Sequence, residues 1–363
     1  MDRWSIAVDR ADIARAALAD APARGLEDGE AEFAVELAAL TANNVTYAAL
    51  GQPNGFLGKD AGYWDFYAPD RSGPGVVPVW GFATVSRSAH PDVREGEGYY
   101  GYWPLASHAV LRPERVGAVG FSDASEHRQK LPALYNSYQR IGALDGYRDE
   151  DRDRWPLYRP LQLTGWLVAD QIADGEVAAQ QVLVAGASSK TGLACAAALK
   201  GRDLEVIGLG SARSFAFLRD SGLYHRVLRY DEVEALDASV PTALVDFAGD
   251  AAVVRAVHAH FGAQLVFDLV VGLTHWRATG DTGDLPGAAR TGFFAPSRLD
   301  KRGKDWGGER LRAAIAEGWA AFMPIARRLT AIDRRQGGEA ALHAWDEAVA
   351  GRADPAKGVL LVP

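Results

Sequence analysis

The residues that most clearly suggest chemistry form a glycine-containing turn at residues 182–192. A continuous apolar run, Val182-Leu183-Val184-Ala185, is typical of a buried parallel strand and leads into small residues. Gly186 permits a tight turn, and Gly192 permits close packing of a helix on the strand. Amides at the start of such a helix, aided by the helix dipole, can hold a pyrophosphate. The turn therefore predicts dinucleotide binding by Gly186, Ser188, Ser189, Lys190, Thr191 and Gly192.

This turn departs from the usual G-x-G-x-x-G fingerprint, because Ser188 or Ser189 fills the position of the middle glycine. Serine hydroxyls there could hydrogen-bond phosphate oxygens, and Lys190 could add positive charge. A phosphate-binding P-loop is excluded, because that motif needs a glycine directly before its lysine and Ser189 stands there. The alternative is a Rossmann-like domain that binds no dinucleotide.

The residues after the next strand bear on which dinucleotide is preferred. An acidic residue there would bind the ribose 2′-hydroxyl of NAD. The sequence Ile207-Gly208-Leu209-Gly210 is instead followed by Ser211 and Arg213, which suit a 2′-phosphate. We therefore predict NADPH as the cofactor.

The elements that would position these residues alternate between strand and helix from residue 180 onward. Apolar strand patterns at 180–188, 203–210, 224–230, 241–250 and 264–273 have helical segments between several of them, which is typical of a parallel sheet. Its ligand crevice is expected at the carboxyl ends of the strands. We expect an irregular loop at 272–306, helix at 307–336 and 339–351, and a strand at 358–362.

The preceding part of the chain has β character with long loops. Phe33, Val35 and Leu37 alternate with Glu32, Ala34 and Glu36, which predicts a half-buried strand. Strands are also expected at 76–85 and in the region 98–112, and a linking helix at 158–174. Loops are expected at 51–80.

This order of elements resembles the medium-chain dehydrogenase/reductase superfamily over most of the chain. The similar segments are 37–51, the linking helix at 158–172, the nucleotide turn at 182–192, the stretches 211–222 and 227–231, and the closing helix and strand at 339–362. The resemblance implies an α/β fold with a GroES-like β-rich catalytic domain and a Rossmann domain, a doubly wound parallel sheet. It also implies that Tyr230 flanks the adenosine phosphate. We expect domains at 1–160 and 161–306, with residues 307–363 returning to the first. A short-chain dehydrogenase is disfavoured, because the glycine turn comes late and no Tyr-x-x-x-Lys pair is present.

The resemblance is to the zinc-independent quinone and enoyl reductases of that superfamily. The zinc-dependent branch has a Gly-His-Glu motif and a four-cysteine lobe, whereas this chain has one cysteine, Cys195, and lacks that motif. The family often pairs the last Rossmann strand across a dimer axis. The resemblance thus implies a homodimer that pairs near Val266–Gly272.

Without zinc, the oxyanion formed during hydride transfer needs another donor. Tyr47 is the main candidate, because its segment faces the nicotinamide in the resembled family. Asn43 is a second, either as an amide donor or as a structural brace. Ten of the twelve tyrosines lie in residues 1–160, which suggests an aromatic-lined substrate pocket or a tyrosine-rich core. Residues that would line the pocket are Tyr63, Trp64, Tyr67, Tyr100 and Trp103.

Composition limits the remaining functions. The 363 residues carry 39 basic and 47 acidic side chains, a net charge of −8, which argues against nucleic acid or an anionic membrane as partner. One cysteine excludes an internal disulfide and cysteine-rich zinc sites, and no metal is expected. The absence of a signal sequence or an apolar span predicts a cytoplasmic protein.

We therefore expect an NADPH-dependent, zinc-independent reductase that transfers hydride to a carbonyl or activated C=C of an apolar or aromatic small molecule. The alternative is a lyase, an isomerase or a non-catalytic cofactor-binding protein on the same fold. The altered glycine turn and the unplaced aromatic loops motivate that alternative.

Overall fold

The computed structural model describes residues 3–53, 57, 60–68, 70, 72–129, 131–174, 177–272 and 283–363. The chain forms two compact units. Unit 1 comprises Met1–Leu157, Ile332–Ala353 and Lys357–Pro363, and unit 2 comprises Tyr158–Ala331 and Asp354–Ala356. The change of unit at residue 157 lies near the expected 160/161 boundary. Residues 307–331, however, belong to unit 2 rather than returning to the first domain.

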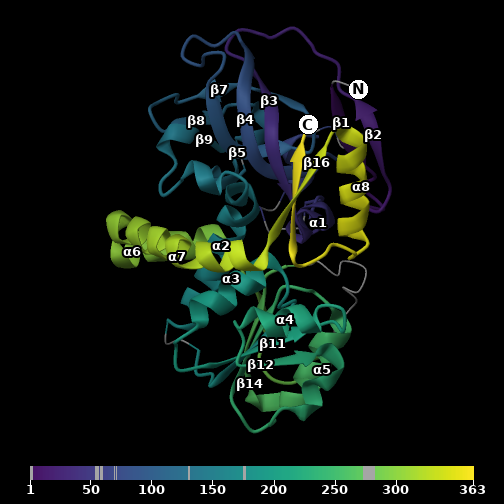
Figure 1. The fold of residues 1–363 in the computed structure, drawn as a ribbon, viewed down its shortest axis with the longest axis vertical. Helices are drawn as coiled ribbons and strands as arrows, with labels where there is room; N and C mark the ends of the chain where they lie inside the picture. The colour runs from purple at the N-terminus through teal and green to yellow at the C-terminus, as the bar shows by residue number, and fades with distance from the viewer. Residues whose placement is uncertain are drawn as a thin grey trace. The chain divides into compact units, whose positions relative to one another are not determined.

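Unit 1 is built on a nine-stranded sheet in the order β16-β17-β3-β4-β5-β9-β8-β7, and β6 also pairs with β3 (Figure 1). The strands are β16 (Ala331–Gln336), β17 (Lys357–Val362), β3 (Ala31–Leu40), β4 (Pro78–Ser88), β5 (Gly98–Pro104), β9 (Ser137–Arg140), β8 (Gly120–Asp123), β7 (Pro113–Glu114) and β6 (His108–Leu111). In β3 the predicted alternation is visible, because Phe33, Val35 and Leu37 are buried while Glu36 is exposed.

Glu32 is a charged exception to this alternation. Its side chain is buried, but Arg3 and Arg87 each donate two hydrogen bonds to its carboxylate. This pairing satisfies the charge inside the sheet, as a buried carboxylate requires.

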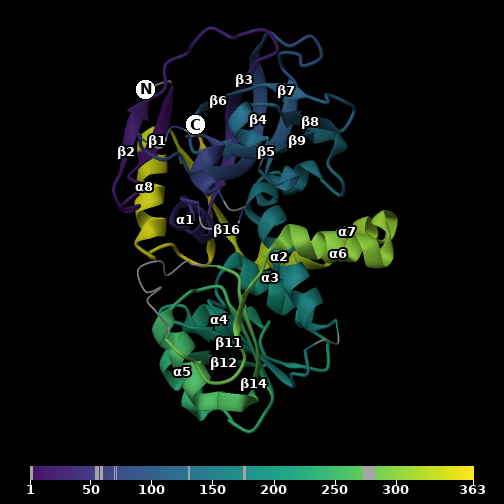
Figure 2. The same cartoon turned by 180° about the vertical axis from the view of Figure 1, so that it is seen from behind.

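The rest of unit 1 surrounds this sheet. Strands β1 (Trp4–Val8) and β2 (Ala16–Asp20) form an antiparallel hairpin, and helix α8 (Gly338–Val349) packs beside it in both views (Figures 1 and 2). Helix α1 (Ala42–Ala49) follows β3 directly. Short 3-10 turns lie at Tyr63–Phe66, Glu126–Arg128, Ala133–Tyr135, Ile141–Ala143 and Asp149–Asp151.

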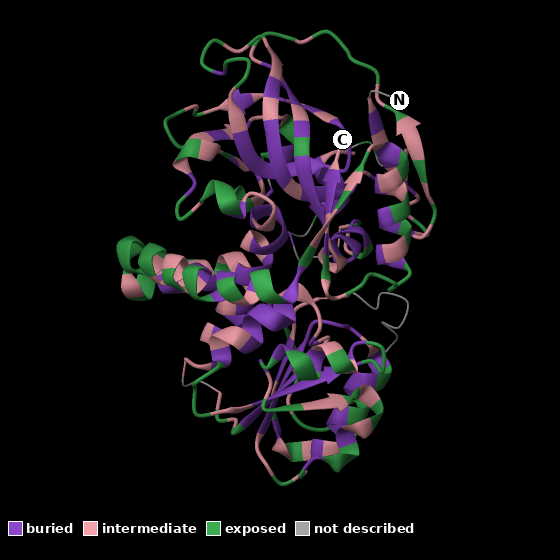
Figure 3. Cartoon of the chain, viewed as in Figure 1, coloured by how far each residue is buried: buried purple, intermediate pink, exposed green. Residues whose placement is uncertain are grey.

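Unit 2 is a six-stranded parallel sheet in the order β12-β11-β10-β13-β14-β15. The strands are β10 (Gln181–Ala185), β11 (Glu205–Gly210), β12 (Arg226–Arg229), β13 (Thr242–Asp246), β14 (Leu265–Val270) and β15 (Arg290–Gly292). Numbered by sequence, this is the 3-2-1-4-5-6 order of doubly wound nucleotide-binding sheets. Its central strands are buried on both faces (Figure 3), as parallel strands between helices must be.

The helices of unit 2 in the described residues are α2 (Arg154–Ile172), whose first turn belongs to unit 1, α3 (Lys190–Leu199), α4 (Phe215–Ser221), α5 (Ala251–Phe261), α6 (Ala295–Trp306) and α7 (Gly308–Leu329). Short 3-10 turns lie at Tyr230–Ala235 and Gly262–Gln264. Helices α6 and α7 lie side by side as a helical hairpin (Figures 1 and 2). The apolar core on one sheet face includes Leu193 and Leu167, and the core on the other includes Val257 and Phe261.

Three expectations about the second half of the chain were wrong in detail. Residues 331–336 are a strand rather than the end of a helix, and residues 295–306 are a helix rather than an irregular loop. The last strand of the parallel sheet in the described residues is Arg290–Gly292, which pairs with β14, rather than the stretch near Val266–Gly272. Residues 290–292 and 295–306 contain few apolar residues. Hydrophobic periodicity therefore did not reveal β15 or the amphipathic α6.

Two properties concern the described residues only. None of their helices combines the length and the apolar character needed to cross a membrane. They also contain no group of three or more histidine, cysteine, aspartate or glutamate side chains arranged to hold a metal ion.

Candidate functional site

The predicted nucleotide turn connects β10 to α3, as the sequence indicated. Gly186 adopts a φ of 74°, a left-handed conformation that favours glycine. A Cβ atom at Gly186 would lie 3.1 Å from the backbone nitrogen of Ala248, and one at Gly192 would lie 2.9 Å from the carbonyl oxygen of Gly186. Both glycines are therefore required by close backbone approach.

Ser189 has a defined structural task in this turn. It is the N-cap of α3, and its Oγ accepts a hydrogen bond from the amide of Gly192 at 3.0 Å. Ser188 is half-buried within the turn, and Thr191 is buried in the first turn of the helix. The Ser189 oxygen therefore caps the helix as an acceptor, and its hydroxyl proton is still available for the predicted hydrogen bond to phosphate.

Two tyrosines hold the turn from neighbouring segments. The Tyr224 hydroxyl donates to the carbonyl oxygen of Ala187 at 2.7 Å. The amide of Gly186 donates to the hydroxyl oxygen of Tyr230, while burial raises the pKa of Tyr230 to about 12. Tyr230 thus lies against the glycine turn, and its expected place beside the adenosine phosphate stays a prediction; the sequence analysis did not identify Tyr224.

Strand register brings the other predicted cofactor residues to the same edge of the sheet. Ala185 pairs with Leu209, and Gly210 pairs with Arg229. Gly186, Ser211 and Tyr230 are the residues that follow these paired positions, so all three stand at the carboxyl ends of adjacent strands. Ser211 is exposed, its Oγ lies 3.3 Å from the Ser214 Oγ, and Arg213 is also exposed.

The charges at this edge suit an anion. Lys190 is the first residue of α3, and burial lowers its pKa to about 8, with Asp354 acting in the opposite direction. No carboxylate follows β11 directly. The acidic side chains of Asp231 and Glu232, after β12, are paired with Arg229. The cradle and its cations therefore fit a dinucleotide with a phosphate on its ribose.

The two predicted catalytic residues meet in unit 1. Asn43 and Tyr47 are four residues apart on α1, so they share one helix face. The Asn43 side chain acts on the Tyr47 hydroxyl in the direction that lowers its pKa, as a hydrogen-bond donor does. Helix α1 is fixed by a capping box between Thr41 and Asn44, and Asn44 also donates to the carbonyl oxygen of Pro78 at 2.9 Å.

Tyr47 belongs to a compact aromatic cluster. Its ring lies 4.6 Å from Tyr63 and 5.4 Å from Tyr102 between centroids, and Trp80 Nε1 donates to its hydroxyl at 3.4 Å. Burial is the main cause that raises the pKa of Tyr47, and the hydroxyl of Tyr135 adds to it. Tyr47 is therefore protonated at neutral pH and can serve as a proton donor.

The residues expected to line a substrate pocket have different positions. Trp103 is packed against Phe33 and Tyr138 in the core, and its Nε1 donates to the carbonyl oxygen of Gly81. Trp64 is equally buried, against Gly51 and Gly75. Tyr63 lies beside Tyr47, Tyr100 stacks on Trp80, and Tyr67 contacts Tyr138. The two tryptophans therefore have packing roles.

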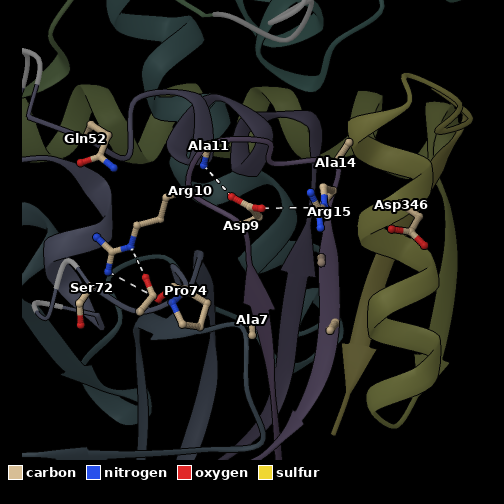
Figure 4. A pocket seen from close by; sticks show the side chains of 13 residues that line it. Ala7, Asp9, Arg10, Ala11, Ala14, Arg15, Gln52, Ser72, Pro74 and Asp346 are labelled. Atoms are coloured by element: carbon tan, nitrogen blue, oxygen red, sulfur yellow. Dashed lines mark hydrogen bonds and ion pairs between the residues drawn. The ribbon is translucent and has the colours of Figure 1, made fainter.

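A cavity of about 970 Å³ opens elsewhere in unit 1, between the β1–β2 hairpin, the 72–74 loop and α8 (Figure 4). Two charged side chains around it have partners. Arg10 donates to the carbonyl oxygens of Gly73 and Ala68, and Asp9 accepts from the Ala11 amide and lies 3.9 Å from Arg15. None of the predicted cofactor or catalytic residues lines this cavity.

Sequence reasoning missed Trp80 and Tyr102, the partners of Tyr47. They face each other across β4 and β5, where Trp80 pairs with Tyr102 and the ring centroids are 4.9 Å apart. The register that joins them depends on a nine-residue connection between the strands, whose geometry a local pattern does not specify.

Comparison with known proteins follows from this architecture. The model of a family described as "Protein of unknown function (DUF2855)" matches residues 38–354. No curated protein matches the sequence.

Several solved structures share the fold. CurA from Vibrio vulnificus is 14% identical with a TM-score of 0.64, covering 99% of this chain and 98% of that one. CurA crystallised with NADPH has a TM-score of 0.61 at the same identity and coverage. The CurK enoyl reductase is 12% identical with a TM-score of 0.55, covering 100% and 99% of the two chains. The expected α/β fold, with a GroES-like β-rich domain and a Rossmann domain, is confirmed.

Proposed function

This chain belongs to the DUF2855 family, and we propose that it is an NADPH-dependent, zinc-independent oxidoreductase. In the proposed reaction, hydride passes to a carbonyl or to an activated C=C of an apolar or aromatic small molecule. The observation that carries the proposal is the convergence of Gly186, Ser211 and Tyr230 at one edge of the parallel sheet.

The proposed cofactor contacts divide by chemistry. The Gly186–Gly192 turn and Lys190 would hold the pyrophosphate, and Ser211 and Arg213 would hold the 2′-phosphate. The bound cofactor supplies hydride. NADPH or NADP in several solved structures of the same fold supports this assignment.

The proposed proton donor is Tyr47, braced by Asn43. When a carbonyl carbon receives hydride, its oxygen gains negative charge and needs a proton or a hydrogen bond. A protonated, buried tyrosine hydroxyl can supply both, and no metal is required for this step. The single cysteine is consistent with that choice, because it excludes the cysteine-rich zinc sites.

The decisive experiment titrates the purified protein with NADPH and NADH and follows cofactor fluorescence. We expect NADPH to bind at least tenfold more tightly. Absence of binding, or tighter NADH binding, would contradict the cofactor assignment. Oxidation of NADPH is then followed with a panel of quinones, enones and aryl ketones. Firm binding without turnover of any of them would instead favour a lyase, an isomerase or a non-catalytic protein.

A further inference from the structure

The hydroxyl of Tyr102 lacks a well-formed hydrogen bond although it is completely buried. Tyr102 is 0% exposed, and its hydroxyl faces the Tyr47 oxygen without reaching full hydrogen-bond geometry. A buried polar group left in this state costs folding free energy, about 1–3 kcal/mol. Such a group calls for a reason, and a catalytic role is one of the recognised reasons.

Tyr102 is held in this position by its own backbone. Its carbonyl oxygen accepts hydrogen bonds from the hydroxyls of Tyr138, at 2.9 Å, and Tyr67. The Arg128 guanidinium lies 4.6 Å above the Tyr67 ring and forms an ion pair of 2.6 Å with Asp123. These contacts hold the Tyr102 backbone in place on its strand and so fix its side chain beside Tyr47.

Tyr102 is one of three donors that converge on a single oxygen. Trp80 Nε1 reaches the Tyr47 oxygen at 3.4 Å, which is long for an N–H···O bond, and the Asn43 side chain acts on the same oxygen from its own helix without a well-formed hydrogen bond. Three hydrogen-bond donors stabilise a neutral phenol oxygen, which keeps its own proton, only weakly. A phenolate oxygen, by contrast, accepts all three strongly, because hydrogen bonds to charged acceptors are shorter and about twice as strong.

We propose that Tyr102, together with Trp80 and Asn43, is a positioning residue whose hydrogen bond to the Tyr47 oxygen tightens when Tyr47 gives up its proton. This inference rests on the proposed function, in which Tyr47 is the proton donor. Long hydrogen bonds that shorten only along the reaction are common in enzymes without bound substrate.

The proposed step balances. Hydride adds to the carbonyl carbon, and the C=O π pair moves to oxygen. That oxygen takes the proton from Tyr47, whose O–H bond breaks to leave a phenolate. The nicotinamide is oxidised, and a solvent proton later restores the Tyr47 hydroxyl. For an enone, the same proton goes to the enolate oxygen.

The test compares Tyr102→Phe with Tyr99→Phe. Tyr99 is a matched control, because it is equally buried on the same strand but packs against Phe33 and Phe121 and donates to Glu97. We expect Tyr102→Phe to lower kcat by about 10- to 100-fold, with KM within about twofold, and Tyr99→Phe to leave both unchanged. Trp80→Phe should also lower kcat, as Tyr102→Phe does.

A spectroscopic measurement tests the contact without turnover. With ¹³Cζ-labelled tyrosine, the Tyr47 resonance is assigned by its loss in Tyr47→Phe. We expect this resonance to shift in Tyr102→Phe and to stay in place in Tyr99→Phe. A Tyr47 resonance that does not shift in Tyr102→Phe would overturn the inference. A kcat of Tyr102→Phe equal to that of the unsubstituted protein would also overturn it.

The failures of the two proposals are distinguishable. If Tyr47→Phe is inactive while Tyr102→Phe is fully active, the inference fails and the proposed function stands. If Tyr47→Phe retains full activity, Tyr47 is not the proton donor and the inference fails with that assignment. If NADPH does not bind, the proposed function fails, whereas the NMR comparison still decides whether Tyr102 contacts the Tyr47 oxygen.

Discussion

At the residue scale, Lys190 couples the proposed phosphate site to pH. Burial lowers its pKa to about 8, so the amine is charged below that pH and increasingly neutral above it. Only the charged form attracts phosphate. We therefore expect the Kd for NADPH to be nearly constant from pH 6 to 7.5 and to rise by up to tenfold per pH unit above about pH 8. Fluorescence titration across this range measures the effect.

Lys190→Met provides the comparison for this pH dependence. The variant should bind NADPH more weakly at pH 7, by about tenfold, and should lose most of the dependence above pH 8. If the variant keeps the same alkaline rise, another group is responsible for it.

Arg213 tests the choice between the two cofactors. It is an exposed cation just beyond β11, and we expect Arg213→Ala to weaken NADPH binding by roughly 10- to 100-fold while changing NADH binding less than about threefold. Ser211→Asp should shift the preference further towards NADH, because a carboxylate repels the 2′-phosphate and can bind a 2′-hydroxyl. Equal losses of affinity for NADPH and NADH would show that Arg213 does not contact the 2′-phosphate.

At the element scale, an ion cluster joins α6 to α2. Arg298 and Arg302 are each 6% exposed and contact both Asp170 and Asp174. Burial alone would raise the pKa of Asp174, but hydrogen bonds from Arg302, Arg298 and Lys301 outweigh it and lower the pKa to about 2. Because the folded pKa is below the unfolded one, this carboxylate stabilises unit 2 above about pH 4, and that contribution is lost as pH falls towards 2.

Asp174→Asn should therefore destabilise unit 2 by about 1–3 kcal/mol at pH 7 and by little near pH 2, measured by urea unfolding. The control is Asp300→Asn. Asp300 pairs with Lys304 on the exposed side of α6, where each side chain is at least 66% exposed. That substitution should cost less than about 1 kcal/mol. Equal effects of the two variants would refute a structural role for the cluster.

Local sequence patterns predicted most of these elements because period and punctuation are local properties. The apolar run before Gly186, the small residues of α3 and the alternation in β3 each indicated the observed element. The short β15 was not predicted, because three residues, two of them exposed, carry no period. Its strand character arises from hydrogen bonds to β14, a partner distant in sequence.

At the scale of the whole molecule, cofactor binding should be visible in stability. A ligand that binds only the folded state adds about 2.7 kcal/mol at 100 times its Kd. We expect NADPH to raise the midpoint temperature of thermal unfolding, measured by calorimetry. If the two units unfold in separate transitions, NADPH should raise the midpoint of only one of them. NADH at the same concentration should raise it less.

We also propose that the protein is a homodimer, with a mass near twice 39.0 kDa. Light scattering after size exclusion measures this mass. The edge strands of the parallel sheet in the described residues are β12 and β15 (Arg290–Gly292), whereas the expected stretch 266–272 pairs with β13 and β15 inside the sheet. A single species at 39.0 kDa would exclude the dimer.

The sequence by itself determined the order of the elements, the glycine turn, the cations beyond the second strand and the lack of cysteine ligands, because each depends on residue types at short spacing. The sequence also named Asn43 and Tyr47 as candidates, and helix α1 places them on one face because they are four residues apart. Only the tertiary structure decided that Trp80 and Tyr102 converge on Tyr47, and that Tyr224 and Tyr230 support the glycine turn. These contacts join segments far apart in the chain, and their geometry depends on strand register and packing that no local pattern encodes.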